Sequence, residues 1–233
     1  MLTTRLLSTF IIAITLIIAG CSNNPDQPFR IESLAKSELD MVIDAHLKQI
    51  NEHAQELMIK IYKRNPKELA KAPAGTTITK RINQLFGHPR QIQFNELGDA
   101  YANDALLLSF NPQFQGDRVF AFMAGVAGII HSSYNYQNEF FMLDPINEQK
   151  IYNSARNLET ASWLLNSSRD ENSTLYLLSN YSTDDGTVNL SFERLFGKLI
   201  SGQDILAAII SNRNNRAINK VLHGVASTTL LPI

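Results

Sequence analysis

The chain has 233 residues, of which 44% are hydrophobic and 18% charged, and its formal net charge at pH 7 is −1. Nucleic-acid binding usually shows as a strongly basic domain, so we expect no nucleic-acid partner. The length allows one sizeable hydrophobic core, and the single cysteine, Cys21, permits no intramolecular disulfide to support it.

The first twenty residues have the pattern of an export signal. Arg5 precedes a mainly apolar stretch at residues 6–18. A helix needs ~20 apolar residues to cross ~30 Å of hydrocarbon, so this stretch is too short to span a membrane. A short apolar segment behind one cation and before small residues is typical of a secretory signal.

The end of this segment carries a more specific pattern. Ile18-Ala19-Gly20-Cys21 resembles the lipobox of bacterial lipoproteins, although Ile18 stands where Leu is usual. The resemblance implies that residues 1–20 are removed and that Cys21 receives diacylglycerol and an N-acyl chain, which attach the protein to membrane lipid. Ser22 resembles an outer-membrane sorting residue, so the implied location is the periplasmic side of the outer membrane. Several acyl chains anchor a protein firmly because each buried methylene contributes ~0.8 kcal/mol.

The rest of the chain divides into a short tether and one domain. Residues 21–32 are polar after the cysteine and contain two prolines, which predicts an extended tether, and residues 33–233 form the predicted bundle. From Ser33 to Asn65 the apolar residues recur every three or four positions, which predicts a long amphipathic helix that Pro66 ends. Its predicted buried residues are Leu39, Ile43, Leu47, Ile50, Ala54, Leu57 and Ile61.

Two shorter amphipathic stretches follow. The first predicts a helix over residues 77–86 that ends at Gly87, with its apolar face formed by Ile78, Ile82 and Leu85. The second covers residues 96–110 and leads into a turn at residues 111–116.

The most apolar part of the domain is residues 119–130. Twelve residues cannot span a bilayer, so we interpret this stretch as a buried central helix, with membrane insertion as the alternative. Small residues at a spacing of four, Ala121 with Gly125 and Ala124 with Gly128, allow another element to approach closely.

The last third is predicted to contain two long helices around a hairpin. Asp144 as N-cap and Pro145 at the first position predict a helix from there to about Ser167, with an inner face of Ile151, Ala155, Leu158 and Leu165. Asp185-Gly186 predicts a hairpin turn. A final helix is expected over residues 191–226, with Leu195, Leu199, Leu206, Ile210, Val221 and Val225 buried. The predicted fold is a mainly α, elongated bundle of about four long and two short helices with one small β-hairpin.

The sequence offers few candidate catalytic or metal-binding residues. It has no Gly-x-Ser-x-Gly motif, its only thiol carries the predicted lipid, and no other cofactor is indicated. His46 and His53 lack the paired Glu-x-x-His segments of a metal site within a bundle, so we interpret them as solvated surface residues. Whether the chain is an enzyme stays open, with the sequence favouring a non-enzyme.

A cationic stripe is the one candidate contact surface. Arg213, Arg216, Lys220 and His223 are three or four positions apart, so they share one face of the predicted last helix. Such a row suits an anionic ligand or an acidic partner, and it also suits a plain solvated face.

Two further resemblances bear on function. Residues 189–194 resemble part of the helix-opening signature of peptidoglycan-binding domains of the outer-membrane protein A type, although Ser191 as a simple N-cap also explains them. The chain from Phe120 to its end resembles proteobacterial lipoproteins without a known activity.

We therefore expect a membrane-anchored envelope lipoprotein that acts as a protein-interaction or scaffold module with an envelope partner. The alternative is a small-ligand or lipid-binding protein, or an enzyme, with a pocket between helices. Its lining would be aromatic: Phe120, Phe122, Phe140, Phe141 and Trp163.

Overall fold

The computed structural model describes residues 36–182, 185–186, 188–214, 218 and 229–233. The predicted signal, Cys21 and the predicted tether lie outside these residues, as do Arg216, Lys220 and His223. The described helices are α2 (Glu38–Arg64), α3 (Pro66–Leu69), α4 (Ile78–Phe86), η2 (Asn95–Leu97, a 3-10 helix), α5 (Asn103–Leu108), α6 (Arg118–Ser133), α7 (Glu148–Ser167) and α8 (Ser191–Asn214). The strands are β1 (Tyr181–Ser182) and β2 (Val188–Asn189).

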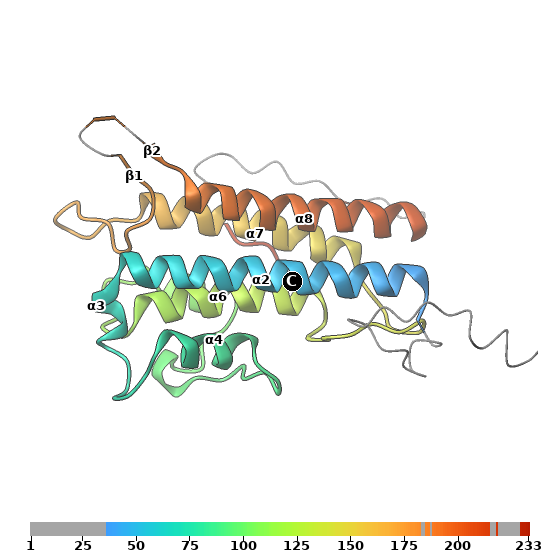
Figure 1. Ribbon diagram of the computed structural model, residues 1–233, viewed down its shortest axis with the longest axis horizontal. Coiled ribbons are helices and arrows are strands. Elements are labelled where there is room, and N and C mark those ends of the chain that lie inside the picture. The colour runs from blue at the N-terminus through green and yellow to red at the C-terminus, as the bar shows by residue number, and fades with distance from the viewer. Residues whose placement is uncertain (1–35, 183–184, 187, 215–217, 219–228) are drawn as a thin grey trace, which may run out of the picture.

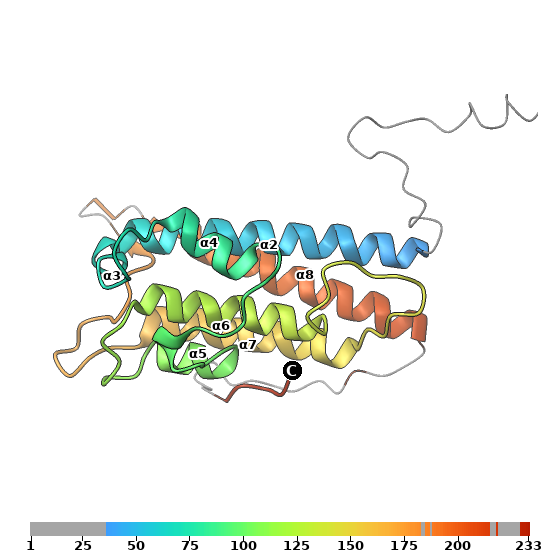
Figure 2. The same cartoon turned by 90° about the horizontal axis from the view of Figure 1, so that it is seen from below.

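Four long helices, α2, α6, α7 and α8, run along a common axis and form the bundle (Figure 1). Helix α2 packs against α6 and α8, and α7 packs against the same two helices from the other side. Helix α4 covers α2 and α6, while α5 lies against α6 (Figure 2). The predicted mainly α bundle is therefore confirmed.

Local sequence explains where α2 begins and ends. Ser37 and Asp40 form a capping box, in which each side chain accepts a hydrogen bond from the other residue's backbone N–H. The chain leaves the helix at Asn65, directly before Pro66, as the proline predicts. Six of the seven predicted inward residues are buried, and Leu39, in the first turn, is half-buried.

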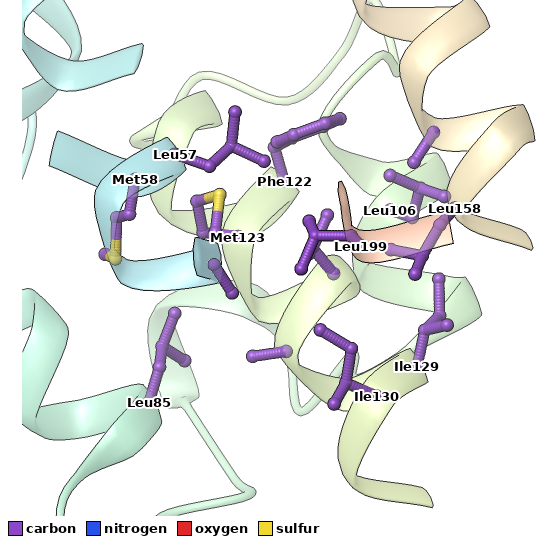
Figure 3. Close-up of a cluster of buried hydrophobic side chains, with 14 of the residues drawn as sticks. Leu57, Met58, Leu85, Leu106, Phe122, Met123, Ile129, Ile130, Leu158 and Leu199 are labelled. Carbon is purple, nitrogen blue, oxygen red and sulfur yellow. The ribbon is translucent and has the colours of Figure 1, made fainter. Parts of the chain in front are cut away.

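Helix α6 is the centre of the fold. All sixteen of its residues are buried, and side chains from the surrounding helices meet around it, including Leu57, Leu85, Leu106, Leu158 and Leu199 (Figure 3). The interpretation of residues 119–130 as a central core helix is confirmed. Within the described part of the chain, no helix is both long and apolar enough to cross a membrane.

Two expected helices differ from the structure. The stretch at residues 96–110 is divided, because Gly98, Asp99 and Ala102 adopt positive φ angles of 59°, 61° and 50°, which no α-helix accommodates. The helix expected with Asp144 as N-cap begins three residues later, with Asn147 as N-cap. Asp144 instead closes a turn, since its carboxylate accepts the Phe141 N–H at 2.8 Å.

Asn147 is the actual N-cap of α7, and its Oδ1 accepts the N–H groups of Gln149 and Lys150. The predicted inner face of Ile151, Ala155, Leu158 and Leu165 is completely buried. The predicted hairpin is present but short, with Tyr181 paired to Asn189 and Ser182 to Val188 in antiparallel register.

Helix α8 begins at Ser191. The Ser191 N–H donates to the Asn189 side-chain oxygen at 3.0 Å. Leu195, Leu199, Leu206 and Ile210 are buried as predicted. The described helix ends at Asn214, and Val221 and Val225 lie outside the described residues.

Candidate functional site: an asparagine clamp that holds the C-terminal segment

The last five residues, 229–233, lie along α7 beside α5 (Figure 2). Asn157 of α7 holds Leu231 by two hydrogen bonds: its Oδ1 accepts the Leu231 N–H at 2.7 Å, and its Nδ2 donates to the Leu231 carbonyl at 2.9 Å. One residue thereby satisfies both main-chain polar groups of another. This is the exchange that a hydrogen-bonded pair makes between antiparallel strands, performed here by a side chain.

Two more asparagines extend the contact. Asn103, the first residue of α5, donates to the Leu231 carbonyl at 3.2 Å. Asn153 donates to the carbonyl of Pro232 at 2.8 Å, and its own carbonyl accepts from Gln149 at 2.8 Å, which orients the amide toward the segment. We call Asn103, Asn153 and Asn157 the asparagine clamp.

The position of the clamp follows from the helix period. Asn153 and Asn157 are four residues apart, so they share one face of α7. That face is largely covered, because Asn153 is 7% and Asn157 0% exposed. A buried amide without partners is destabilising, and the main chain of the C-terminal segment supplies partners to both. Leu230 and Ile233 pack against the hydrophobic core beside it.

The small residues of α6 allow α5 to pack closely against it. A Cβ on Gly125 would lie 2.7 Å from the backbone of Leu106, and one on Gly128 would lie 2.5 Å from the backbone N of Ala102. The close approach predicted from the small-residue spacing therefore exists. It places Asn103 beside Asn157, whose Nδ2 donates to Asn103 Oδ1 at 3.3 Å.

A buried charged network lies at the end of the bundle where α2 ends and α6 begins. Arg81 of α4 is 1% exposed and forms two bonds to the Glu96 carboxylate, at 2.5 and 2.7 Å. It also contacts Asp117 at 3.3 Å, and Asp117 accepts the Tyr62 hydroxyl at 2.7 Å. Burial raises the pKa of the Asp117 carboxyl, and the hydrogen bonds from Tyr62 and the Phe120 N–H and the Arg81 charge oppose that rise.

A second polar network crosses the middle of the bundle. Gln203 of α8 is 0% exposed; its carbonyl accepts from Tyr134 at 2.6 Å and its amide donates to Ser154 at 2.7 Å. His46 contacts the same carbonyl at 3.2 Å, and burial lowers the pKa of its imidazole. The interpretation of His46 as a solvated surface residue is therefore wrong.

The other histidines hold separate positions. His131 is fully buried between Asn51 and Tyr101, at 3.2 and 3.3 Å. His53 is half-buried and contacts Gln49 at 3.4 Å. Among the described residues, no group of three or more His, Cys, Asp or Glu side chains is arranged to hold a metal ion.

The aromatic residues considered for a pocket lie mainly in the core. Phe120 and Phe122 are completely buried and pack edge-to-face on Phe94 and on Phe110 and Phe196, respectively. Phe140 is also buried, against Tyr134, whereas Phe141 and Trp163 are half-buried. The structure does not bring these five side chains together around one space.

Of the four residues in the predicted cationic stripe, the structure describes Arg213. It is exposed near the end of α8 and lines a hollow of about 410 Å³ between α2, α8 and the segment that joins α6 to α7. No protein-family model matches the chain, and comparison with curated proteins and with solved structures gives no significant match.

The sequence analysis missed the asparagine clamp. Its available signal was Asn153 and Asn157 next to the inner-face residues Ile151, Ala155 and Leu158, since polar amides beside core positions call for partners. A second signal was the apolar end of the chain, Leu230-Leu231-Pro232-Ile233, after a more polar stretch.

Proposed function

We propose that this protein is a lipid-anchored envelope module whose asparagine clamp binds an extended polypeptide segment of a partner protein. The resident C-terminal segment is a tethered occupant of the same clamp. The observation that carries the proposal is the pair of hydrogen bonds between the Asn157 amide and the main chain of Leu231. Contacts of this kind recognise an extended backbone, as strand addition does, and leave sequence preference to the neighbouring side-chain positions.

The contacts also define the chemistry of the partner segment. It needs a free N–H and carbonyl at the residue facing Asn157, and only a carbonyl at the next residue, which explains why Pro232 is accommodated. Apolar side chains at the positions of Leu230 and Ile233 would pack against the core. We therefore expect an apolar, extended segment in which proline is tolerated after the central residue.

The tethered C-terminal segment competes with the partner segment for the asparagine clamp. A segment joined to its own site competes at an effective concentration that reaches the millimolar range for short flexible linkers. The partner must overcome this competition, so the apparent affinity of the intact chain is lower than that of a chain without the segment.

The test uses a synthetic peptide of residues 227–233 and a chain shortened to end at residue 228. We expect saturable binding by isothermal titration calorimetry, weaker binding to the intact chain, and at least about tenfold weaker binding when Asn157→Ala is added to the shortened chain, which is ~1.4 kcal/mol. A peptide N-methylated at Leu231 keeps every side chain but loses the donor to Asn157, so it should lose affinity equally. A folded shortened chain that ignores both peptides would refute the proposal.

The lipid anchor has its own test. In cells, the mature N-terminus should be Cys21 carrying diacylglycerol and an N-acyl chain, detected by mass spectrometry of the N-terminal peptide. Cys21→Ser should abolish both processing and membrane partition. An intact N-terminus on the wild-type chain would contradict the lipid anchor and would leave the proposed binding of peptides to the asparagine clamp unaffected.

A further inference from the structure

One end of the bundle presents unusually exposed apolar side chains. Leu143 is 94% and Met142 64% exposed, at the tip of the segment that joins α6 to α7. Met41 and Val42, near the start of α2, are 51% and 47% exposed. Figure 1 shows that this end holds the start of α2, the α6–α7 connection and the end of α8.

Hydrogen bonds hold the chain on both sides of the apolar tip formed by Met142 and Leu143. Phe140 is 1% exposed, and its N–H donates to Asp44 of α2 at 2.8 Å. Asp144 closes the turn from the other side: it accepts the Phe141 N–H with its carboxylate and donates its own N–H to the Phe141 carbonyl, both at 2.8 Å. These bonds fix the turn that carries Met142 and Leu143, and their adjacent exposed side chains form an apolar surface of the kind that marks an interaction site.

We propose that Met142 and Leu143 enter the lipid surface to which Cys21 is attached, so that this end of the bundle faces the membrane. This inference depends on the lipid anchor of the proposed function. The described chain begins at Lys36 at this same end, about 15 residues after Cys21. Fifteen residues reach at most about 50 Å, so the anchor would attach at this end of the bundle and the lipid would lie within that distance of it.

The neighbouring charges fit a lipid–water interface. Lys36 forms an ion pair with Asp44, and its ammonium lies 4.7 Å from the centre of the Phe141 ring. Arg213 is exposed on the rim of the adjacent hollow, where Met142 also contributes to the lining. The side chain of Lys36 is only 12% exposed and its charge is neutralised by Asp44, so Arg213 is the exposed cation that this argument uses. Apolar side chains beside a cation suit the headgroup boundary of a membrane.

The first experiment measures depth with a fluorescent label on lipidated full-length protein. Cys21 is the only cysteine and is acylated in this proposal, so Leu143→Cys provides one reactive thiol. The protein is placed in vesicles of phosphatidylethanolamine and phosphatidylglycerol that contain a fraction of spin-labelled lipid. We expect the label at position 143 to be blue-shifted and quenched by the lipid-borne spin label.

The matched control is Leu178→Cys. Leu178 is 42% exposed and bonds through its backbone to Asn65, at the other end of α2, so its label should remain unquenched. A vesicle-bound protein with no quenching at position 143 would overturn the inference. Shielding of position 143 in native envelopes but not in pure vesicles would also overturn it, because the occupant would then be a protein.

The second experiment measures retention by lipid. Leu143→Asp should increase the rate at which the lipidated protein transfers between vesicles by about tenfold or more. Ile205→Asp is the control, because Ile205 is 58% exposed on α8, and it should leave the rate unchanged. Equal rates for wild type and Leu143→Asp would contradict the inference. A protein without acylated Cys21 would stay in the aqueous phase in every case, which would be a failure of the lipid anchor instead.

Discussion

Gly128 of α6 and Ala102, the N-cap of α5, lie so close that a Cβ on the glycine would be 2.5 Å from the alanine backbone nitrogen. Such contact leaves no room for a methyl group without a movement of the α5 backbone. Because Asn103 follows Ala102 directly, the same contact places one member of the asparagine clamp.

Replacing this glycine tests the contact. Gly128→Ala should destabilise the fold by about 1–3 kcal/mol through overpacking, measured as the free energy of unfolding in urea. Gly197 of α8 is the matched control, since its Cβ position has no neighbour within 4 Å. Gly197→Ala should stabilise the protein by roughly 0.5–1 kcal/mol, because alanine is the better helix former. Equal effects of the two substitutions would show that α5 does not lie against α6 as described.

The asparagine clamp predicts how a nearly isosteric change acts. Asn157→Asp keeps the acceptor for the Leu231 N–H but replaces the donor to the Leu231 carbonyl with a buried oxygen anion. We expect release of the C-terminal segment, seen as at least tenfold faster hydrogen exchange at the Leu231 amide, roughly 1.4 kcal/mol of lost protection. Asn212→Asp makes the same change of charge at an exposed position of α8 and should leave this exchange rate unchanged.

The network around Arg81 predicts strong coupling between Arg81 and Asp117 in their effects on the free energy of unfolding. Arg81→Met would leave Asp117, which is 2% exposed, without its cation and should destabilise the fold by about 3–5 kcal/mol. Asp117→Asn in the same chain should restore part of that loss, because no uncompensated charge then stays buried. A double-mutant cycle in urea measures this coupling, and strictly additive effects would contradict the network.

His131 predicts a pH dependence of stability. Burial, followed by the charges of Arg90 and His88, lowers its pKa well below the ordinary value of 6.5. As the pH falls below 6.5, the unfolded chain therefore binds a proton that the folded chain does not, and stability decreases by up to ~1.4 kcal/mol per pH unit. Above 6.5 this contribution to stability is fully present.

His131→Gln removes that proton uptake, so the loss of unfolding free energy between pH 7.5 and 5.5 should be about 1 kcal/mol smaller in the variant. The pKa values of His46 and His53 are also lowered, and they contribute equally to both proteins. The difference between the two pH profiles is therefore specific to His131. Identical profiles would contradict its neutral, buried state.

Periodicity predicted the long helices because their buried faces repeat at helical spacing. The stops also followed local rules, at Pro66 and at Gly87, the C-cap of α4. The start of α7 was wrong because Asp144 and Asn147 are both good capping residues, and the contact of Phe140 with Asp44, 96 positions earlier, anchors the turn that uses Asp144. Sequence pattern does not contain that contact.

The candidate site was harder to predict, because it too depends on contacts between residues that are far apart in the sequence. The clamp joins Asn103, Asn157 and Leu231, which are separated by 54 and 74 positions. Arg81, next to Ile82 in α4, is 1% exposed, and its charge is neutralised by Glu96 and Asp117 from other parts of the chain. Polar residues with distant partners give no periodic signal.

The 27 residues of α2 extend over about 40 Å, at 1.5 Å per residue. The Debye length at physiological ionic strength is about 8 Å. The two ends of this helix are therefore several Debye lengths apart, and their charges are largely screened from each other. The cations Lys36 and Arg213 at one end and the Arg81 network at the other are therefore electrically independent. A change of ionic surroundings at the first end leaves the protonation of Asp117 unaltered.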